Sequence, residues 1–458
     1  MEKYDVIVIG SGVGMNIIDE AVNHDMKVAL VDKGPLGGTC PNLGCIPSKV
    51  LITVADRIVE IQESKKLGVT ADIVDINFRA IMNRMRKGVR ERQSYMKKGL
   101  SQSGNPAYYQ GECHFVRDYV IKVGDAEIQG DKFFIACGTR PAIPPIKGLE
   151  KVKYLTNETV LKLKEMPEKI VIIGGGYIGV EYAHFFSAMG SRVTLLEMTD
   201  RLIAGEEPAI ADLLKAKLSR RMQVMTGVSI ESVRQNNRSI SVSTVVKSKG
   251  RDRKIKLTSQ HLMIATGRKS NADTLKLENT GIDVDDKDFI KVDKYFETTK
   301  KNIYAVGDIS GKYMFTHVGN REASIAAENL INGEQLEINY HACPHAIYSY
   351  PQIASVGMTE KQAKGAGYTL LVGTTAYMDV AKGEALMESD GFVKIILNKD
   401  TADILGCHII GPYAPILIQE VVNAMTTGGQ TDELINGIHI HPAMPEVIQA
   451  SLSHLEEV

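Results

Sequence analysis

The sequence predicts an α/β protein made of two similar parallel-sheet units and a smaller C-terminal α+β domain. Three observations predict this class. An apolar strand that runs into a glycine turn and a helix occurs twice, and each copy is followed by a second strand that ends in an acid. From about Tyr340 the pattern changes to short alternating strands and helices. Alternation of strand and helix is typical of a parallel sheet covered by helices, and short alternating strands are typical of an α+β domain.

The two copies have the residue pattern of dinucleotide-binding units. The first runs over 6–14 and the second over 170–179, and the acids that end the following strands are Asp32 and Glu197. In such a turn, one glycine permits the bend, one lets a pyrophosphate approach, and one lets the helix pack close to the strand. The candidate glycines are Gly10, Gly12, Gly14, Gly174, Gly176 and Gly179. The second copy fits all three positions, whereas the third position of the first copy is Met15, directly after Gly14.

Each unit also has a matching downstream strand that ends in a turn. These returning segments are 134–140 and 263–268. A further apolar strand over 302–308 ends in Gly307-Asp308 and is followed by a predicted helix over 321–330. Two acids placed about 20 residues after two glycine turns suit the ribose hydroxyls of two dinucleotides. Glu197 favours NAD(H), because a 2′-phosphate prefers an arginine; Arg201 is interpreted as a surface residue.

Charge and composition exclude several classes of protein. The chain has 458 residues and a net charge of −1, which gives no general attraction to nucleic acid or anionic lipid. No apolar run approaches the length of a membrane helix, and the N-terminal residues lead directly into strand 6–9, so no signal peptide is expected. The six cysteines are too sparse for a secreted disulfide scaffold. We therefore expect a soluble, cytoplasmic protein that contacts neither nucleic acid nor membrane.

Cys40 and Cys45 are the most informative residues. Two thiols separated by four residues can close a small disulfide ring, and glycines before the ring allow close approach to a flat ligand. A structural disulfide is disfavoured, because so short a loop removes little chain entropy. Zinc would need a second ligand pair, which the sequence does not supply. The pair is therefore interpreted as a redox-active disulfide beside a cofactor.

These motifs give the chain a definite resemblance. The block GGTC-x-x-x-GC-I-P-S-K over 37–49, with four further motifs in the expected order, resembles the FAD-containing pyridine-nucleotide disulfide oxidoreductases, over essentially the whole chain. The resemblance implies that 1–145 and 268–337 hold FAD, that 146–267 hold NAD, and that 338–458 form a dimerisation domain. It also implies that Asp308 and Thr316 contact the flavin nucleotide and that Lys49, paired with Glu181, lies near the flavin. The cofactor-binding residues implied in this way are Gly10, Gly12, Gly14, Asp32, Gly38, Thr39, Lys49, Gly138, Gly174, Gly176, Gly179, Glu181, Glu197, Gly267, Arg268, Asp308 and Thr316.

The C-terminal segment supplies the remaining catalytic candidates. Residues 441–446 resemble the His-Pro-x-x-x-Glu signature of the same family, which makes His441 the base and Glu446 its orienting carboxylate. An imidazole can take and return the thiol proton near neutral pH. In the family this histidine comes from the partner subunit, so an obligate homodimer is implied.

The substrate indications are divided. Met15 and the Pro442–Pro445 segment resemble mycothione reductases, the acids Asp19 and Glu20 argue against glutathione, and Glu197 fits NAD-linked dihydrolipoamide dehydrogenases. We expect a dihydrolipoyl dehydrogenase in which electrons pass from the dithiol through Cys40 and Cys45 to FAD and then to NAD+. The alternatives are an NAD(P)H-dependent reductase of a low-molecular-weight disulfide, or an assembly or redox-sensing subunit of a 2-oxo acid dehydrogenase complex.

Three other features are interpreted as structural. The basic stretch 82–98 has helical spacing and is predicted to be a solvated helix. His341, Cys343 and His345 alternate along a predicted strand and lack a fourth ligand, so no metal site is expected. The three cysteines in apolar strands are predicted to be buried: Cys113, Cys137 and Cys407.

Overall fold

The computed structural model describes residues 1–237, 239–246 and 252–458. The chain forms two compact units, each assembled from segments that are distant in sequence. Unit 1 contains 1–48, 82–142 and 267–338, and unit 2 contains 49–81, 143–266 and 339–458. Helices α3 (Cys45–Glu63) and α4 (Phe78–Ser103) each cross a boundary between the units.

Unit 1 is organised around a sheet of strand order β3-β2-β1-β6-β5-β4, with β16 also paired to β6. The pairs β3·β2, β2·β1, β1·β6 and β16·β6 are parallel, whereas β4, β5 and β6 pair antiparallel. The elements of unit 1 are β1 (Glu2–Ile9), α1 (Gly14–Asn23), β2 (Val28–Asp32), α2 (Thr39–Leu43), β3 (Ala107–Gln110), β4 (Cys113–Arg117), β5 (Val120–Val123), β6 (Ala126–Ile135), β7 (Thr139–Pro141), β15 (Arg268–Ser270), β16 (Ile303–Ala305) and α7 (Thr316–Asn332).

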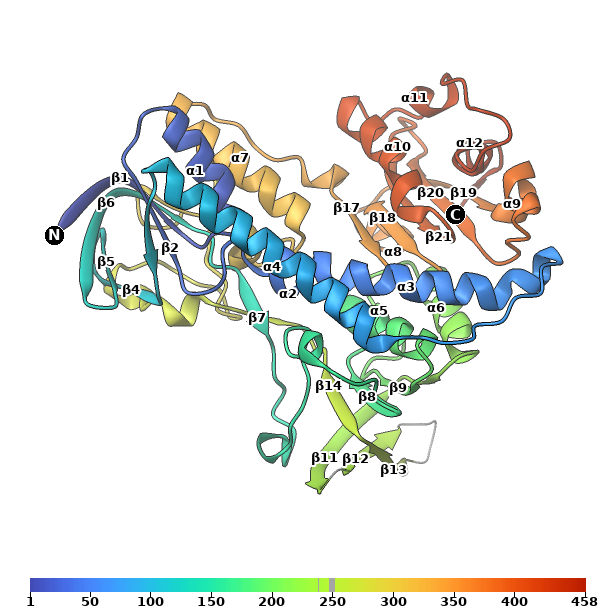
Figure 1. Cartoon of the computed structure of the whole chain (residues 1–458). Helices are drawn as coiled ribbons and strands as arrows, with labels where there is room; N and C mark the ends of the chain where they lie inside the picture. Colours follow the sequence, from blue (N-terminus) through green and yellow to red (C-terminus); the bar gives the residue numbers. More distant parts are fainter. Residues whose placement is uncertain (238, 247–251) are drawn as a thin grey trace. The chain divides into compact units, whose positions relative to one another are not determined.

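Strand β1 shows why this sheet forms. Val6 and Val8 pack into one core with residues of α1 and α7, while Ile7 and Ile9 pack into a second core on the opposite face. A parallel strand that is buried on both faces reads as a continuous apolar run, which is the pattern of 6–9. In Figure 1, α1 and α7 lie side by side over this sheet.

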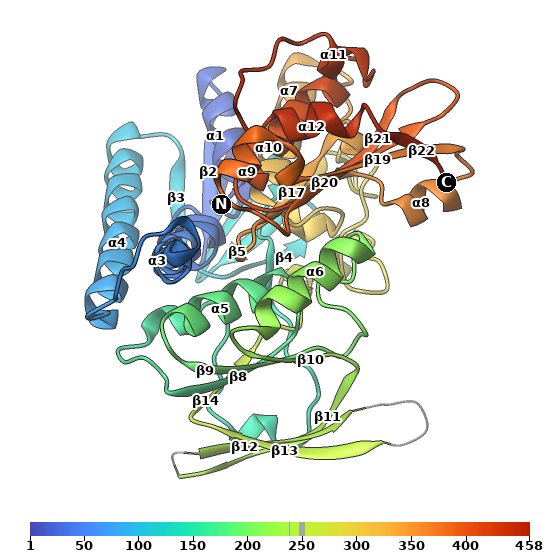
Figure 2. The same ribbon diagram turned by 90° about the vertical axis from the view of Figure 1, so that its right-hand side faces the viewer.

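The first part of unit 2 repeats the parallel arrangement. Its sheet has the order β10-β9-β8-β14, with every neighbouring pair parallel, and β11-β12-β13 form a separate antiparallel sheet. Figure 2 shows α5 and α6 above the strands of the parallel sheet. The elements are β8 (Lys169–Ile173), α5 (Tyr177–Ala188), β9 (Arg192–Leu196), α6 (Pro208–Ser219), β10 (Gln223–Met225), β11 (Val228–Asn236), β12 (Ser239–Val246), β13 (Arg253–Ser259) and β14 (His261–Ile264).

The C-terminal part of unit 2 is an α+β arrangement. Its antiparallel sheet has the order β17-β18-β21-β20-β19-β22, and residues of α10 and α12 share a core with β18, β20 and β21. The predicted fold class is therefore confirmed. The elements are β17 (Pro344–Ile347), β18 (Ile353–Gly357), α8 (Glu360–Gly365), β19 (Leu370–Ala376), α9 (Ala381–Ala385), β20 (Phe392–Asn398), β21 (Ile404–Ile410), α10 (Ala414–Thr427), α11 (Asp432–Ile435), α12 (Glu446–Ser451) and β22 (Leu455–Glu457).

The same kind of backbone contact occurs once in each of the two parallel sheets. Gly10 has φ +107° and a Cβ there would lie 2.4 Å from the carbonyl oxygen of Ala136; Gly174 has φ +111° and a Cβ there would lie 2.2 Å from that of Ala265. Each alanine directly follows the strand that returns beside the first strand, β6 or β14. The sequence repeat is therefore a structural repeat.

The structure corrects three details of the sequence interpretation. The helix predicted over 321–330 extends over Thr316–Asn332 and ends at Gly333, which has φ +70°. His341 is not on the strand with His345: it lies in a single 3-10 turn over Tyr340–Ala342, where the Asn339 side chain accepts a hydrogen bond from its N–H. Cys113 and Cys407 are buried as predicted, but Cys137 is only half-buried.

Two further findings concern surfaces. The basic stretch 82–98 is helical, as part of α4, with Met82 and Met85 buried and most of its cations exposed. Across residues 1–237, 239–246 and 252–458, none of the helices combines the length and apolar character needed to cross a bilayer.

The first glycine turn gives a test of the fold. We expect Gly10→Ala to lower the free energy of unfolding by about 2–4 kcal/mol, because the methyl group would need both a disfavoured φ and displacement of the Ala136 carbonyl. The matched control is Gly12→Ala, whose Cβ would lie 3.8 Å from its nearest neighbour, the Gly38 Cα, and which we expect to change stability by less than about 1 kcal/mol. Thermal and urea unfolding measure both; equal stability of the two variants would contradict the argument.

Candidate active site

The first glycine turn and the cysteine segment form one continuous backbone surface in unit 1. A Cβ on Gly38 would lie 2.8 Å from the Cα of Gly12, so Gly38 must lack a side chain for the two loops to approach. Gly14 performs the helix-packing role expected of the third glycine, because a Cβ there would lie 2.7 Å from the Val8 side chain. Two bare backbone segments beside the N-terminus of α1 suit the pyrophosphate of a dinucleotide.

Asp32 forms hydrogen bonds with the glycine turn and with the segment that leads to the cysteines. Its Oδ2 accepts hydrogen bonds from the Ser11 N–H at 2.7 Å and the Ser11 hydroxyl at 2.5 Å, and its Oδ1 accepts from the Gly34 N–H at 2.7 Å. The Ser11 hydroxyl oxygen in turn accepts from the Gly37 N–H at 2.9 Å. Asp32 therefore orients the glycine turn as well as marking the end of β2.

The two predicted redox cysteines lie at the starts of two consecutive helices. Cys40 is in the first turn of α2, whose first residue is Thr39, and Cys45 begins α3. The exposed Cys45 has its Sγ 3.5 Å from the hydroxyl of Thr316, the first residue of α7. A helix N-terminus stabilises a thiolate, so both positions suit thiol–disulfide exchange.

Asn42, between the cysteines, shapes their loop. It is 3% exposed, and its amide nitrogen donates to the carbonyl oxygens of Leu36 and Gly38, each at 2.8 Å. Its side-chain oxygen accepts from Gln93 of α4 at 2.8 Å. Sequence reasoning missed Asn42 and Gln93. The signal available in the sequence was a polar amide side chain, Asn42, between the two cysteines.

Predicted flavin-site residues from three distant segments meet at Thr139. The Thr139 hydroxyl donates to Asp308 Oδ2 at 2.9 Å and accepts from Arg268 Nε at 3.0 Å, while Arg268 Nη2 donates to the Thr139 carbonyl at 2.8 Å. Gly138, with φ +60°, lies beside Asp308, and the Gly267 carbonyl accepts from the Ala142 N–H at 3.0 Å. Burial raises the pKa of Asp308. A mostly buried carboxyl group aimed at this junction suits the polyhydroxyl portion of a flavin nucleotide, so the residues fit FAD.

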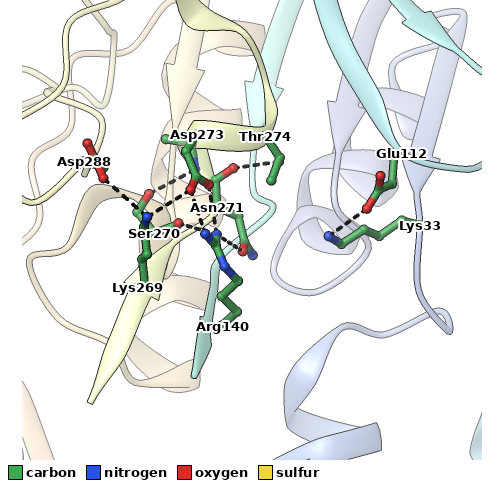
Figure 3. A network of polar contacts seen from close by, with 10 residues as sticks. Lys33, Glu112, Arg140, Lys269, Ser270, Asn271, Asp273, Thr274 and Asp288 are labelled. Carbon is green, nitrogen blue, oxygen red and sulfur yellow. Dashed lines mark hydrogen bonds and ion pairs between the residues drawn. The ribbon is translucent and has the colours of Figure 1, made fainter. Parts of the chain in front are cut away.

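A salt-bridge network holds the neighbouring strands β7 and β15 (Figure 3). Arg140 donates to both carboxylate oxygens of Asp273, at 2.6 and 2.9 Å, and to the Ser270 carbonyl at 2.8 Å. Lys269 lies 3.1 Å from the same carboxylate and 3.8 Å from Asp288. The hydrogen bonds from Arg140 lower the pKa of Asp273 to about 2. This pairing keeps Thr139 and Arg268 on adjacent strands.

The second glycine turn is in unit 2 and repeats the logic of the first. Glu197 Oε2 accepts from the Gly175 N–H at 2.6 Å, as Asp32 does from Ser11. A Cβ on Gly179 would lie 1.8 Å from the Gly174 carbonyl oxygen, whereas a Cβ on Gly176 would meet nothing within 4 Å. The open space at Gly176 suits a ligand pyrophosphate, so this turn fits a pyridine nucleotide.

An ion pair between the half-buried Lys49 and the buried Glu181 also lies within unit 2. Lys49, one helical turn after Cys45, donates to the two carboxylate oxygens of Glu181 at 2.9 and 2.8 Å. Glu181 is 6% exposed and also accepts from the Tyr348 N–H at 3.0 Å, and the Lys49 ammonium lies 4.7 Å from the Tyr348 ring centre. The buried carboxylate is thus fully paired and fixes the position of the lysine.

The predicted C-terminal pair has the expected geometry. His441 Nδ1 lies 2.8 Å from Glu446 Oε1, and Glu446 Oε2 accepts from the Ala443 N–H at 2.8 Å. The hydrogen bond with His441 lowers the pKa of Glu446. The imidazole is 71% exposed, so its Nε2 edge is available to a reacting group. His439 is instead held by Glu420, at 2.6 Å.

Comparison with known proteins places the chain in a family. The pyridine nucleotide-disulphide oxidoreductase family matches residues 4–323, and the dimerisation domain of the same family matches 343–452. The chain is 32% identical to mycothione reductase of Mycobacterium tuberculosis over 99% of both chains. It is 33% identical to dihydrolipoyl dehydrogenase of Bacillus subtilis, covering 97% of this chain and 94% of that protein.

A solved structure agrees with this placement. The Cu(II) complex of the HOCl-induced flavoprotein disulfide reductase RclA from Escherichia coli is 28% identical, with a TM-score of 0.87 and 99% of both chains covered. The chain therefore belongs to the pyridine nucleotide-disulphide oxidoreductases. Within that class it is a flavoprotein disulfide reductase with a dimerisation domain, and FAD and a pyridine nucleotide are the cofactors typical of the family.

Glu197 gives a test of nucleotide choice. Its carboxylate should bind a ribose diol and repel a 2′-phosphate, and Arg201 is engaged with Asp212 at 2.9 Å. We expect kcat/KM to favour NAD(H) over NADP(H) by roughly a hundredfold, equivalent to a few kcal/mol. Glu197→Gln should reduce this preference about tenfold, whereas Asp200→Asn, which removes an exposed charge nearby, should not. A wild-type preference for NADPH would contradict the assignment.

Proposed function

We propose that this chain is an NAD-linked dihydrolipoyl dehydrogenase that oxidises a small dithiol through Cys40 and Cys45. The observation that carries the proposal is the Glu197 carboxylate held at the second glycine turn by the Gly175 N–H. It favours NAD, the acceptor used in dithiol oxidation, and dihydrolipoyl dehydrogenases are among the relatives. The reaction takes one dithiol and one NAD+ to a disulfide, NADH and a proton.

The cysteines divide the chemistry between them. A substrate thiolate attacks the Cys40 sulfur of a Cys40–Cys45 disulfide, which forms a mixed disulfide and releases the Cys45 thiolate. The second substrate thiolate then displaces Cys40, so the substrate leaves as a disulfide and both cysteines are reduced. FAD, when bound, supplies the two-electron transfer from this dithiol pair to NAD+.

His441 and Glu446 manage the protons of this exchange. The Nε2 edge of His441 takes a proton from the attacking thiol, which generates the thiolate that exchange requires. Glu446, held by the Ala443 N–H, fixes the ring through Nδ1 and stabilises its protonated form. We propose that this pair acts on the cysteines of the partner subunit of a homodimer.

The other assignments are parts of the same proposal. The FAD-binding domain consists of 1–145 and 268–337, and the NAD-binding domain of 146–267. Residues 338–458 form the dimerisation domain. A pair of thiols that cycles during turnover suits the cytoplasm. Membership of a 2-oxo acid dehydrogenase complex would supply the lipoyl substrate.

A second candidate is the reverse reaction, NAD(P)H-dependent reduction of a low-molecular-weight disulfide. It is favoured by the full-length likeness to mycothione reductase and by Met15 and the Pro442–Pro445 segment. Steady-state assays with dihydrolipoamide and NAD+, set against a panel of disulfides with NADH and NADPH, separate the two. The second proposal would replace the first if kcat/KM for reduction of another disulfide were at least about tenfold higher than kcat/KM for dihydrolipoamide oxidation and for lipoamide reduction.

Exchange of each cysteine tests the proposed division of roles. We expect Cys40→Ser and Cys45→Ser to purify with FAD bound and to lose dithiol oxidation almost completely. Cys40→Ser should keep the Cys45 thiolate, which should perturb the flavin absorption spectrum, because we propose that Cys45 is the cysteine held against the flavin. Cys113→Ser serves as the control, because that thiol is buried in a strand. Full dihydrolipoamide activity in either active-site variant would contradict the mechanism.

Subunit mixing tests the source of the histidine. His441→Gln should lose at least about 10²-fold in kcat, the usual contribution of general-base assistance. Unfolding and refolding Cys40→Ser together with His441→Gln should form heterodimers with one intact site each, and activity should recover to about half per heterodimer. Heterodimers that form without recovery would mean that each site is built within one chain.

A further inference from the structure

A buried carboxylate that the disulfide chemistry does not use lies in unit 2. The Glu206 side chain is 1% exposed and is surrounded by donors. Its Oε1 accepts from the Tyr177 hydroxyl at 2.7 Å and from His345 Nε2 at 2.6 Å, and its Oε2 accepts from the Ser355 hydroxyl at 2.7 Å. Every donor is a side chain, so the cluster depends on residue identity and not on backbone geometry alone.

The cluster connects two parts of unit 2 that are distant in sequence. Tyr177 is the first residue of α5, directly after the second glycine turn, and Glu206 precedes α6. His345 and Ser355 belong to β17 and β18 of the C-terminal sheet. The C-terminal sheet thus reaches the start of the helix whose N-terminal amides are assigned to the nucleotide phosphates.

Residues near both ends of the segment 197–206 form hydrogen bonds with the second glycine turn and with the residue that follows it. Glu197 accepts from the Gly175 N–H at 2.6 Å, and the Ile203 N–H donates to the Gly175 carbonyl at 2.9 Å. Glu206 then holds Tyr177. The first two contacts fix the bend, whereas the third fixes the first residue of the helix.

His345 makes a ring contact in addition to its hydrogen bond with Glu206. Its ring stacks on the Tyr177 ring, with centroids 5.7 Å apart and planes inclined by 12°. Burial opposes ionisation of Glu206, but the hydrogen bonds from His345, Tyr177 and Ser355 outweigh it and lower its pKa to about 2. Glu206 is therefore a carboxylate at neutral pH, and removal of the His345 donor would leave a buried charge with less support.

The backbone beside Glu206 is held separately. Glu207 accepts from the Lys394 ammonium and from the Glu360 N–H, at 2.7 and 2.5 Å, and Lys394 also pairs with Glu360. Loss of His345 should therefore loosen the Tyr177 side chain without releasing the loop.

From this geometry we propose that His345 and Glu206 are positioning residues for pyridine-nucleotide binding, which act by holding Tyr177 and the first turn of α5. The inference rests on the assignment of the second glycine turn to the pyridine nucleotide. It gives a role to a histidine that belongs to the C-terminal sheet and that makes no contact with the cysteine chemistry in the proposed mechanism.

The primary test is calorimetric titration of the oxidised holoenzyme with NAD+, which measures binding without turnover. We expect His345→Ala to raise the Kd about tenfold and Tyr177→Phe, which removes only the hydroxyl, about threefold. His345→Gln keeps a donor and should restore the Kd to within about threefold of wild type. His341→Ala is the matched control: that histidine is four residues away and bonds the Ile404 carbonyl at 3.0 Å, so the Kd should not change.

A second measurement separates positioning from a general loss of structure. In stopped-flow experiments, flavin reduction by NADH should reach half-maximal rate at a roughly tenfold higher concentration in His345→Ala, while reduction by dithiothreitol should be unchanged. Equal slowing of both half-reactions, or an unchanged Kd in His345→Ala, would overturn the inference. Failure of the wild-type enzyme to bind NAD+ or NADH would instead overturn the nucleotide assignment in the proposed function. If His345→Ala does not fold, Tyr177→Phe and His345→Gln still decide the outcome.

Discussion

The close approach of a glycine to the returning strand governs both nucleotide units. At Gly10 and Gly174 the backbone carbonyl of the facing alanine occupies the space of a Cβ, and both glycines have φ above +100°. That contact turns the chain sharply at the C-terminal end of the first strand, so the next helix starts directly above the sheet. The acid that ends the second strand then binds a turn N–H, through Asp32 or Glu197. The bend therefore places the glycine turn, the start of the following helix and the acid of each unit beside one another.

Unit 2, in the part that the structure describes, contains three buried glutamate side chains. Glu181, Glu206 and Glu207 are each exposed by 6% or less, and each has a cationic or hydroxyl donor. Burial of a carboxylate is costly unless its oxygens are hydrogen-bonded, so such groups are sensitive to loss of a single partner. These buried carboxylates fix the positions of other side chains: Glu181 holds Lys49, and Glu206 holds Tyr177, which follows the second glycine turn.

Much of the fold could be predicted because its signals are local. The apolar run 6–9 and the strand ending at Asp32 are buried parallel strands, and the basic stretch in α4 is a helix. Cys40, Cys45, His441 and Glu446 were recognisable because their spacing is distinctive, and the last two lie at hydrogen-bonding distance. The errors were also local: the Asn339 side chain makes a 3-10 turn at His341, which alternation along a strand did not reveal.

The sequence by itself determined the fold class and the two glycine turns and named the candidate reactive residues, because these depend on residue types at short, fixed separations. Only the tertiary structure showed that Thr139 joins Gly138, Arg268 and Asp308, that Asn42 is bonded to Gln93, and that Glu206 is shared by Tyr177, His345 and Ser355. Those residues are separated by tens to hundreds of positions along the chain. Hydrogen-bond partners at such separations are selected by packing of whole elements, which leaves no periodic signal in the sequence.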